Sequence, residues 1–162
     1  LEVVIGTSEV MDEGYSTYEE TVALIEKLEN ERTQTKNLLF NRAGDIKFKS
    51  SQDSYMYYFK VVDGVQGNLA FWMLGKQDKY VEMNLTKVKP VFTKVSIHGW
   101  DLSKMQILVG EEGNLKPLEY KEFIDTQYTK TYILDKPLCP DIMRIEIPTD
   151  QTVEMYEIEL FA

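Results

Sequence analysis

The sequence predicts an all-β domain, an antiparallel sandwich of about eight strands with a jelly-roll arrangement, preceded by a helical segment. Two observations lead to this class. From Asp45 onward, apolar and polar residues alternate with the two-residue period of strands, whereas the segment before Gly44 has a helical period. In addition, clusters of Gly, Pro, Asn and Asp separate the short apolar runs, which is typical of turns between antiparallel strands.

The first expected element is a helix that begins near Thr17. Ser16 and Glu19 have the spacing of a capping box, in which each side chain bonds the backbone amide of the other residue. Apolar side chains then recur on one helical face, at Tyr18, Val22, Ile25 and Leu28. The capping residues and this stripe together predict an amphipathic helix.

The helical segment is expected to be separate from the strands that follow it. Residues 29–36 are polar on all sides, which is typical of a solvated helix or of one that packs on a neighbouring domain. Gly44 is a suitable stop. We interpret residues 1–44 as a helical connector or the end of a preceding domain, and residues 45–162 as the sandwich. A chain that opens on Leu1 is expected to be part of a longer protein.

The expected strands follow from alternation and from β-branched and aromatic content. They cover residues 46–48, 55–62, 80–85, 92–98, 105–109, 128–134, 142–147 and 153–161. In the third, Val81, Met83 and Leu85 face one way, and in the fourth Val95 and Ile97 face the core.

Charge and composition exclude several kinds of partner. The net charge of −9 argues against nucleic acid and anionic membrane surfaces, both of which require clustered Lys and Arg. No apolar run is long enough to span a membrane, so no membrane insertion is expected. Cys139 is the only cysteine, which excludes an intrachain disulfide.

Catalysis is not expected of the isolated chain. His98 with Asp101 lacks a nucleophile, and Cys139 lies between Leu138 and Pro140 without a companion base. No Gly-rich phosphate-binding loop occurs. A nucleophile, a base and an orienting group are therefore not found together.

The order of motifs resembles that of the discoidin (coagulation factor 5/8 type C) domain and its bacterial relatives, the family 32 carbohydrate-binding modules. The motifs are the Asp63-Gly64 loop leading to Trp72, two strands at 80–85 and 92–98, the segment KMQILVGEEG at 104–113, and a closing pair at 144–147 and 156–160. The resemblance covers about residues 45–162. It implies that Trp72 lies in the core, because the family's tryptophan at this place packs under the loop.

This resemblance implies a galactose-binding-like sandwich that serves as a non-catalytic carbohydrate-binding module of a larger bacterial glycoside hydrolase. Its partners would be a glycan and the neighbouring catalytic domain of the parent chain, in an extracytoplasmic location. The alternative is a structural domain of the same fold, which buttresses the catalytic domain without binding sugar.

The resemblance also implies a structural calcium ion. Asp63 matches the family's first ligand and Glu157 its last, a set of oxygen ligands suited to a hard cation. The family's Thr before the tryptophan is missing here, so Asn68 would have to take its place. In the alternative interpretation Asp63 only holds a turn through its own backbone.

The candidate sugar-binding residues are Trp100, His98 and Asp101, in the loop His98-Gly99-Trp100-Asp101. An indole can stack on the apolar face of a pyranose while polar neighbours bond its hydroxyls. The alternative is that Trp100 closes the end of the core and Asp101 caps the short turn that follows.

Overall fold

The computed structural model describes residues 17–34, 36–51, 58–67, 69–74 and 77–162, with the side chains of 29–34 left aside. The chain divides into two compact units between Thr35 and Lys36. The first contains one described helix and the second contains all of the described strands. No helix among the described residues is both long and apolar enough to cross a membrane.

Helix α2 (Tyr18–Gln34) confirms the predicted helix. Its cap lies one residue later than expected, because the Thr17 hydroxyl accepts the Glu20 N–H at 3.1 Å and lies 3.1 Å from the Glu20 carboxylate. Ser16 lies outside the described residues. Thr17 and Glu20 have the same spacing as Ser16 and Glu19, so the sequence offers two overlapping boxes, and the helix uses the second.

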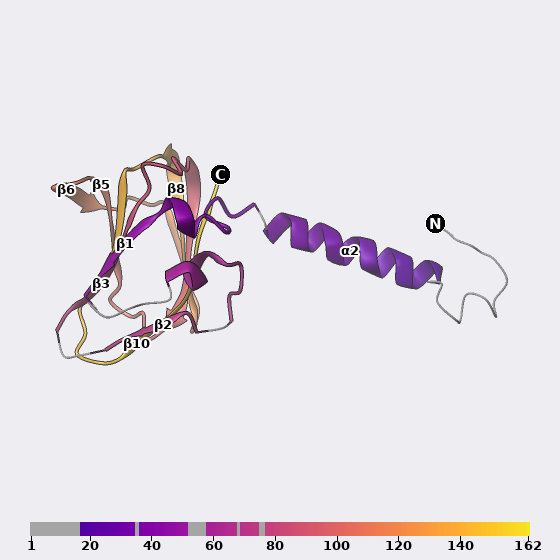
Figure 1. Ribbon diagram of the computed structural model, residues 1–162, viewed down its shortest axis with the longest axis horizontal. Coiled ribbons are helices and arrows are strands. Elements are labelled where there is room, and N and C mark those ends of the chain that lie inside the picture. The colour runs from indigo at the N-terminus through magenta and orange to yellow at the C-terminus, as the bar shows by residue number, and fades with distance from the viewer. Residues whose placement is uncertain (1–16, 35, 52–57, 68, 75–76) are drawn as a thin grey trace. The chain divides into compact units, whose positions relative to one another are not determined.

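The second unit is a sandwich of two sheets in which every strand pair is antiparallel (Figure 1). One sheet has the order β1 (Lys47–Ser50), β3 (Lys79–Asn84), β9 (Ile142–Ile147), β5 (Gln106–Glu111) and β6 (Asn114–Pro117). The other has the order β2 (Phe71–Met73), β10 (Val153–Phe161), β4 (Phe92–Trp100), β8 (Thr129–Leu138) and β7 (Glu122–Asp125). Two short 3-10 helices, η1 (Ala43–Asp45) and η2 (Tyr58–Val62), lie outside the sheets. The predicted antiparallel sandwich is confirmed.

The core fills the space between the inner faces of the two sheets, as the alternation predicts. Val81 and Met83 of β3 and Val95 and Ile97 of β4 are fully buried. Ten strands occur in the described part of the chain rather than about eight. The additional ones, β2, β6 and β7, are three or four residues long, too short for alternation to indicate them from sequence.

The predicted strand at residues 55–62 is wrong for its described part. Residues 58–62 form η2, and residues 55–57 lie outside the described residues. Val61 and Val62 are both fully buried. A strand would send two adjacent side chains to opposite faces, whereas a helical turn can direct both toward the core.

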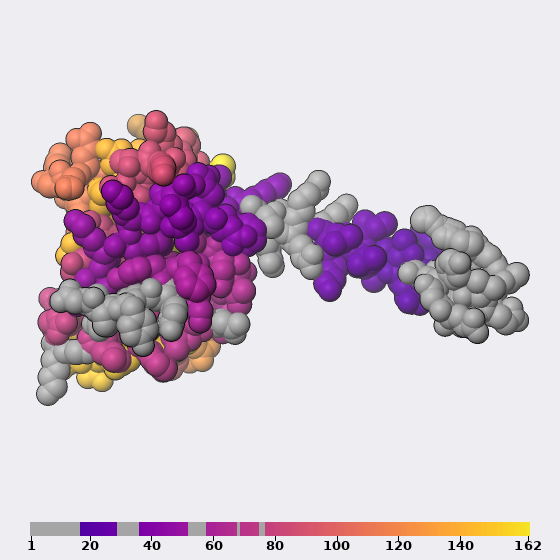
Figure 2. Space-filling view, viewed as in Figure 1, coloured from indigo at the N-terminus to yellow at the C-terminus, as the bar shows by residue number. Residues whose placement is uncertain are grey.

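The sandwich unit begins before Asp45. Asn37 is buried, and its side-chain oxygen accepts the N–H groups of Leu39 (3.1 Å) and of Leu160 in β10 (2.9 Å). Leu39 itself lies in the core. Figure 2 shows residues 36–50 beside residues 58–67 on the face turned to the viewer. The two segments are joined by a hydrogen bond from the Asn41 N–H to the Val62 carbonyl, at 2.7 Å. The boundary therefore lies at Lys36 and not at Gly44.

Two shortened chains test this boundary. A chain that begins at Lys36 is expected to unfold at nearly the same urea concentration as the full chain. A chain that begins at Asp45 lacks Leu39 and Asn37, and loss of one buried leucine alone costs about 2–5 kcal/mol. Leu39→Ala in the full chain should reproduce much of that loss. Equal stability of the two shortened chains would contradict the boundary.

Candidate functional site

A bulge in β10 shapes one end of the second sheet. Met155 pairs with Gly99 and Glu157 with His98, so Tyr156 is an extra residue in β10. Met155 is fully buried on the inner face. Because of the bulge, the side chains of two consecutive residues, Tyr156 and Glu157, both lie on the outer side of β10 and neither enters the core. A Cβ on Gly99 would lie 2.3 Å from the Glu154 carbonyl oxygen, so the strands approach this closely only with glycine there.

Three aromatic rings gather at this end of the sheet. Trp100, the last residue of β4, is 42% exposed, and its ring centroid lies 5.6 Å from that of Tyr128. The Tyr128 ring lies 6.3 Å from that of Tyr156, in a stacked arrangement. Trp100 and Tyr128 are exposed and Tyr156 is half-buried, and together their rings form a ready surface for stacking a flat apolar ligand face.

A pocket of about 490 Å³ lies beside these rings. It is lined by Gln66, Gly67, His98, Tyr128, Thr129 and Tyr156. The two ring nitrogens of His98 are both held, Nε2 at 2.6 Å from a Glu159 carboxylate oxygen and Nδ1 at 2.9 Å from the Thr129 hydroxyl. The pocket therefore combines aromatic walls with fixed polar groups, which is the composition of a small-ligand site.

The structure brings together two of the three predicted sugar-binding residues. His98 lines the pocket, and Trp100, two residues further along β4, lies against Tyr128. Asp101 has a φ of 63° and begins the turn in which the Met105 N–H bonds the Leu102 carbonyl, and it is not among the residues that line the pocket. Trp100 is too exposed to close the end of the core.

The prediction that Trp72 lies in the core is wrong. Trp72 is 52% exposed, because the other two residues of β2, Phe71 and Met73, face the core. Tyr128 and Tyr156 were not predicted as site residues. The sequence carries no signal for the bulge that places Tyr156, although the aromatic residue just before a strand could have indicated Tyr128.

The loop after η2 meets the buried part of β10. The Asp63 carboxylate accepts the Val65 N–H at 2.9 Å, which is the turn-holding role considered from sequence. Gly64, with a φ of 86°, donates its N–H to Glu157 Oε2 at 2.8 Å. Glu157 is fully buried, and its other oxygen has no hydrogen-bond partner among the described residues.

Solved structures resemble the sandwich unit, whereas no family model and no curated protein matches the chain. CpGH89CBM32-6 of Clostridium perfringens is 15% identical, with a TM-score of 0.59 over 77% of this chain and 98% of that one. The family 32 module of Clostridium perfringens NanJ, solved with galactose, is 12% identical, with a TM-score of 0.53 over 72% and 93%. The Streptococcus pneumoniae fucose-binding module SpX-3 is 14% identical, with a TM-score of 0.57 over 78% and 97%. The fold is the galactose-binding-like β-sandwich. It confirms the fold that the resemblance implied.

Within this galactose-binding-like sandwich, the pKa of the Glu157 carboxyl group lies far above its ordinary value. Burial raises the pKa of Glu157 to about 9; the Gly64 N–H opposes this rise, and the charges of Asp63 and Glu159 add to it. At neutral pH the carboxyl group therefore needs either a proton or a cation beside it.

Two of the three predicted calcium ligands, Asp63 and Glu157, fit a hard cation. No group of three or more His, Cys, Asp or Glu side chains arranged to hold a metal occurs among the described residues. Asn68, the third predicted ligand, lies outside them. Asp63 and Glu157 nevertheless lie close enough to interact, and the unpartnered Glu157 oxygen is a donor of the type that calcium takes.

The raised pKa predicts how stability depends on pH in a chelator. The folded-state pKa is about 9 and the ordinary value is 4.5, so the folded form binds more protons between these values. The melting temperature is therefore expected to fall as pH rises from about 5 to about 9. Glu157→Gln should flatten this part of the profile, and the exposed control Glu112→Gln should not. Identical slopes for wild type and Glu157→Gln in calorimetry would contradict the assignment.

Proposed function

We propose that the chain is a non-catalytic carbohydrate-binding module of a larger bacterial glycan-degrading enzyme, and that it binds glycan at the pocket between Tyr128 and Tyr156. The observation that carries this proposal is the set of three neighbouring aromatic rings, two of them exposed, beside a pocket with fixed polar groups. In this proposal the neighbouring domain of the parent chain carries the catalysis, and the protein acts outside the cytoplasm.

The proposed binding mode uses each part of the site. The apolar face of a pyranose stacks on Trp100 or Tyr128. Its hydroxyls bond the side chains of Gln66 and Thr129, which line the pocket. His98, held on both sides, keeps Thr129 in place, so the polar groups need little rearrangement on binding.

The solved structures support a glycan ligand. One was solved with galactose, and another is named a fucose-binding module. The described residues of the pocket also favour binding over turnover, because both His98 nitrogens are engaged and the exposed Cys139 is not among the residues that line it.

A glycan array followed by titration of the best ligand tests the proposal. Trp100→Ala is expected to weaken binding about twofold to tenfold, the contribution of one stacked ring, and to leave the melting temperature nearly unchanged. The control is Tyr120→Ala, which removes another exposed ring outside the pocket. An array without any bound glycan would favour the buttressing domain instead, and a large loss of stability in Trp100→Ala would remove this residue from the site.

We also propose that Asp63 and Glu157 hold a structural Ca²⁺. The ion would supply the positive charge that the buried Glu157 carboxylate lacks and would tie the loop after η2 to β10. The unpartnered, buried Glu157 oxygen supports this proposal.

Calcium is expected to raise the melting temperature above its value in chelator, because a ligand that binds only the folded state stabilises it by mass action. Asp63→Asn keeps an oxygen that can accept the Val65 N–H, so it should lose the calcium increment but keep most of the stability in chelator. Asp63→Ala should lose both, and the exposed control Asp78→Ala neither. If the melting curves with calcium and with chelator are the same, Asp63 does not bind calcium and only holds the turn through the Val65 N–H.

A further inference from the structure

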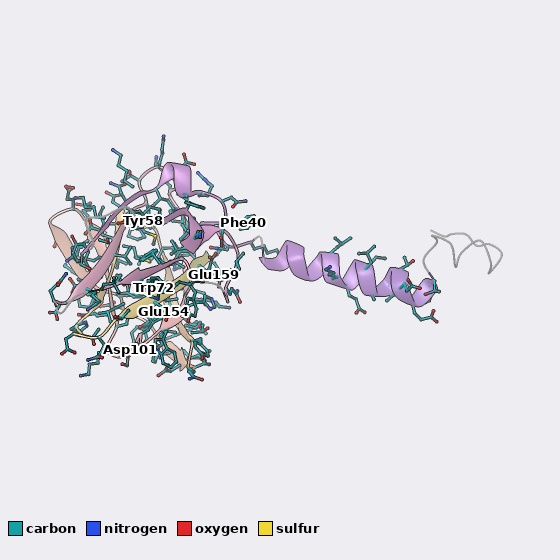
Figure 3. The ribbon with its side chains drawn as sticks, turned by 60° about the horizontal axis from the view of Figure 1, so that its bottom comes forward. Phe40, Tyr58, Trp72, Asp101, Glu154 and Glu159 are labelled. Atoms are coloured by element: carbon teal, nitrogen blue, oxygen red, sulfur yellow. The ribbon has the colours of Figure 1, made fainter. Side chains whose placement is uncertain are left out.

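The outer face of the second sheet carries a row of three side chains next to the pocket. Glu154 of β10 pairs with Trp72 of β2 on one side and with Trp100 of β4 on the other. Figure 3 shows Trp72 and Glu154 together on this face. A single carboxylate therefore stands between two indoles that are each about half exposed. We call Trp72, Glu154 and Trp100 the indole–carboxylate row.

Glu154 has no ionic partner within the described residues. One of its oxygens accepts the Tyr156 hydroxyl at 2.8 Å, and Glu154 takes part in none of the ion pairs found there. On the outer face of the other sheet, by contrast, Arg144 pairs with Glu82 and Glu146. Burial, and then the bond to Glu154, raise the pKa of Tyr156 to about 12, so the phenol remains a donor to the carboxylate.

An anionic group between aromatic faces attracts cations. An indole face attracts an ammonium group through its quadrupole, and a carboxylate attracts it through its charge. Adjacent strands lie about 4.8 Å apart, so the backbones of Trp72 and Trp100 are separated by about 10 Å, with Glu154 midway. None of the described residues in the row or lining the pocket is Lys or Arg.

We infer that the ligand of this site is an amino sugar with a free ammonium group, of the glucosamine type, and that Glu154 selects it. The inference rests on the proposed function and names the class of glycan for the same site. N-acetylation removes the positive charge, and a carboxylated sugar is repelled by Glu154. Neutral and acidic glycans therefore bind more weakly than the free amine.

An amino sugar matches more of the site than a lysine side chain does. It offers an apolar ring face to Trp100 or Tyr128, hydroxyls to the polar pocket, and an ammonium group to Glu154. A lysine side chain offers only the ammonium group and a flexible apolar stem.

Isothermal titration of the full chain tests the inference with a glucosamine tetramer and an N-acetylglucosamine tetramer of the same linkage. The amine tetramer is expected to bind more tightly at low salt, and the difference should shrink in high salt because screening weakens exposed charge pairs. Glu154→Gln keeps an acceptor for the Tyr156 hydroxyl and removes the charge. It should lower affinity for the amine tetramer roughly fivefold and leave the N-acetylated tetramer unchanged.

Glu112→Gln, in the β5–β6 turn, removes an equal charge elsewhere and should alter neither affinity. Trp72→Ala should weaken the amine tetramer without changing the melting temperature, since Trp72 is not part of the core. Equal affinities of the wild type for both tetramers, or equal losses in Glu154→Gln, would overturn the inference while other bound glycans keep the proposed function. Binding of a lysine-rich peptide through Glu154 without binding of the amine tetramer would also overturn it. Absence of binding to any glycan would remove both proposals.

Discussion

The structure of this site depends on the burial of two carboxylates, Glu157 and Glu159, on the outer face of β10. A buried carboxylate is costly unless hydrogen bonds or an opposite charge compensate it. Glu159 bonds His98 and the Gln66 side chain (2.9 Å), whereas Glu157 accepts the Gly64 N–H at one oxygen and has no hydrogen-bond partner at the other among the described residues. These bonds fix the loop after η2 on the sheet. The same loop brings Gln66 to the pocket, so the acids that must be compensated also position the rim of the site.

The bulge at Tyr156 divides β10 into two stretches with different surroundings. On one side of it Glu154 is partly exposed between two indoles, and on the other side Glu157 is buried and bonded to the loop. If Tyr156 were paired in regular alternation instead of bulged, Glu154 and Glu157, which are three residues apart, would face opposite sides of the sheet. The binding surface and the buried acids are therefore consecutive parts of one strand, and whatever neutralises Glu157 also holds the loop that borders the pocket.

Alternation predicted the inner faces of β3 and β4 correctly because it depends only on the pleat. It could not predict that Ser96 and His98, on the other face of β4, are also buried, since their cover comes from interactions with distant segments. The error at Trp72 has another origin: the resemblance placed this tryptophan in the core under the loop, whereas alternation in the three-residue strand β2 turns it outward because Phe71 and Met73 face the core. A bulge changes which side chains of a strand face the core, and it has no sequence signature. The sequence therefore could not predict that Tyr156 lies on the outer face beside the pocket.

Two departures from ordinary folding preferences lie side by side on the second sheet, exposed indoles and a carboxylate between them. Trp72 and Trp100 leave large apolar surfaces in water, and Glu154 between them has no ionic partner among the described residues, although carboxylates on the other sheet are paired with Arg144. Neither feature stabilises the folded chain, because exposed indoles lose the gain from burial and an isolated surface charge contributes little. Sites at which a sequence departs from what folding alone requires are commonly those that bind a ligand. A ligand that covers the indoles and brings a positive charge to Glu154 would compensate both departures at once, and this is the physical reason to expect a cationic sugar.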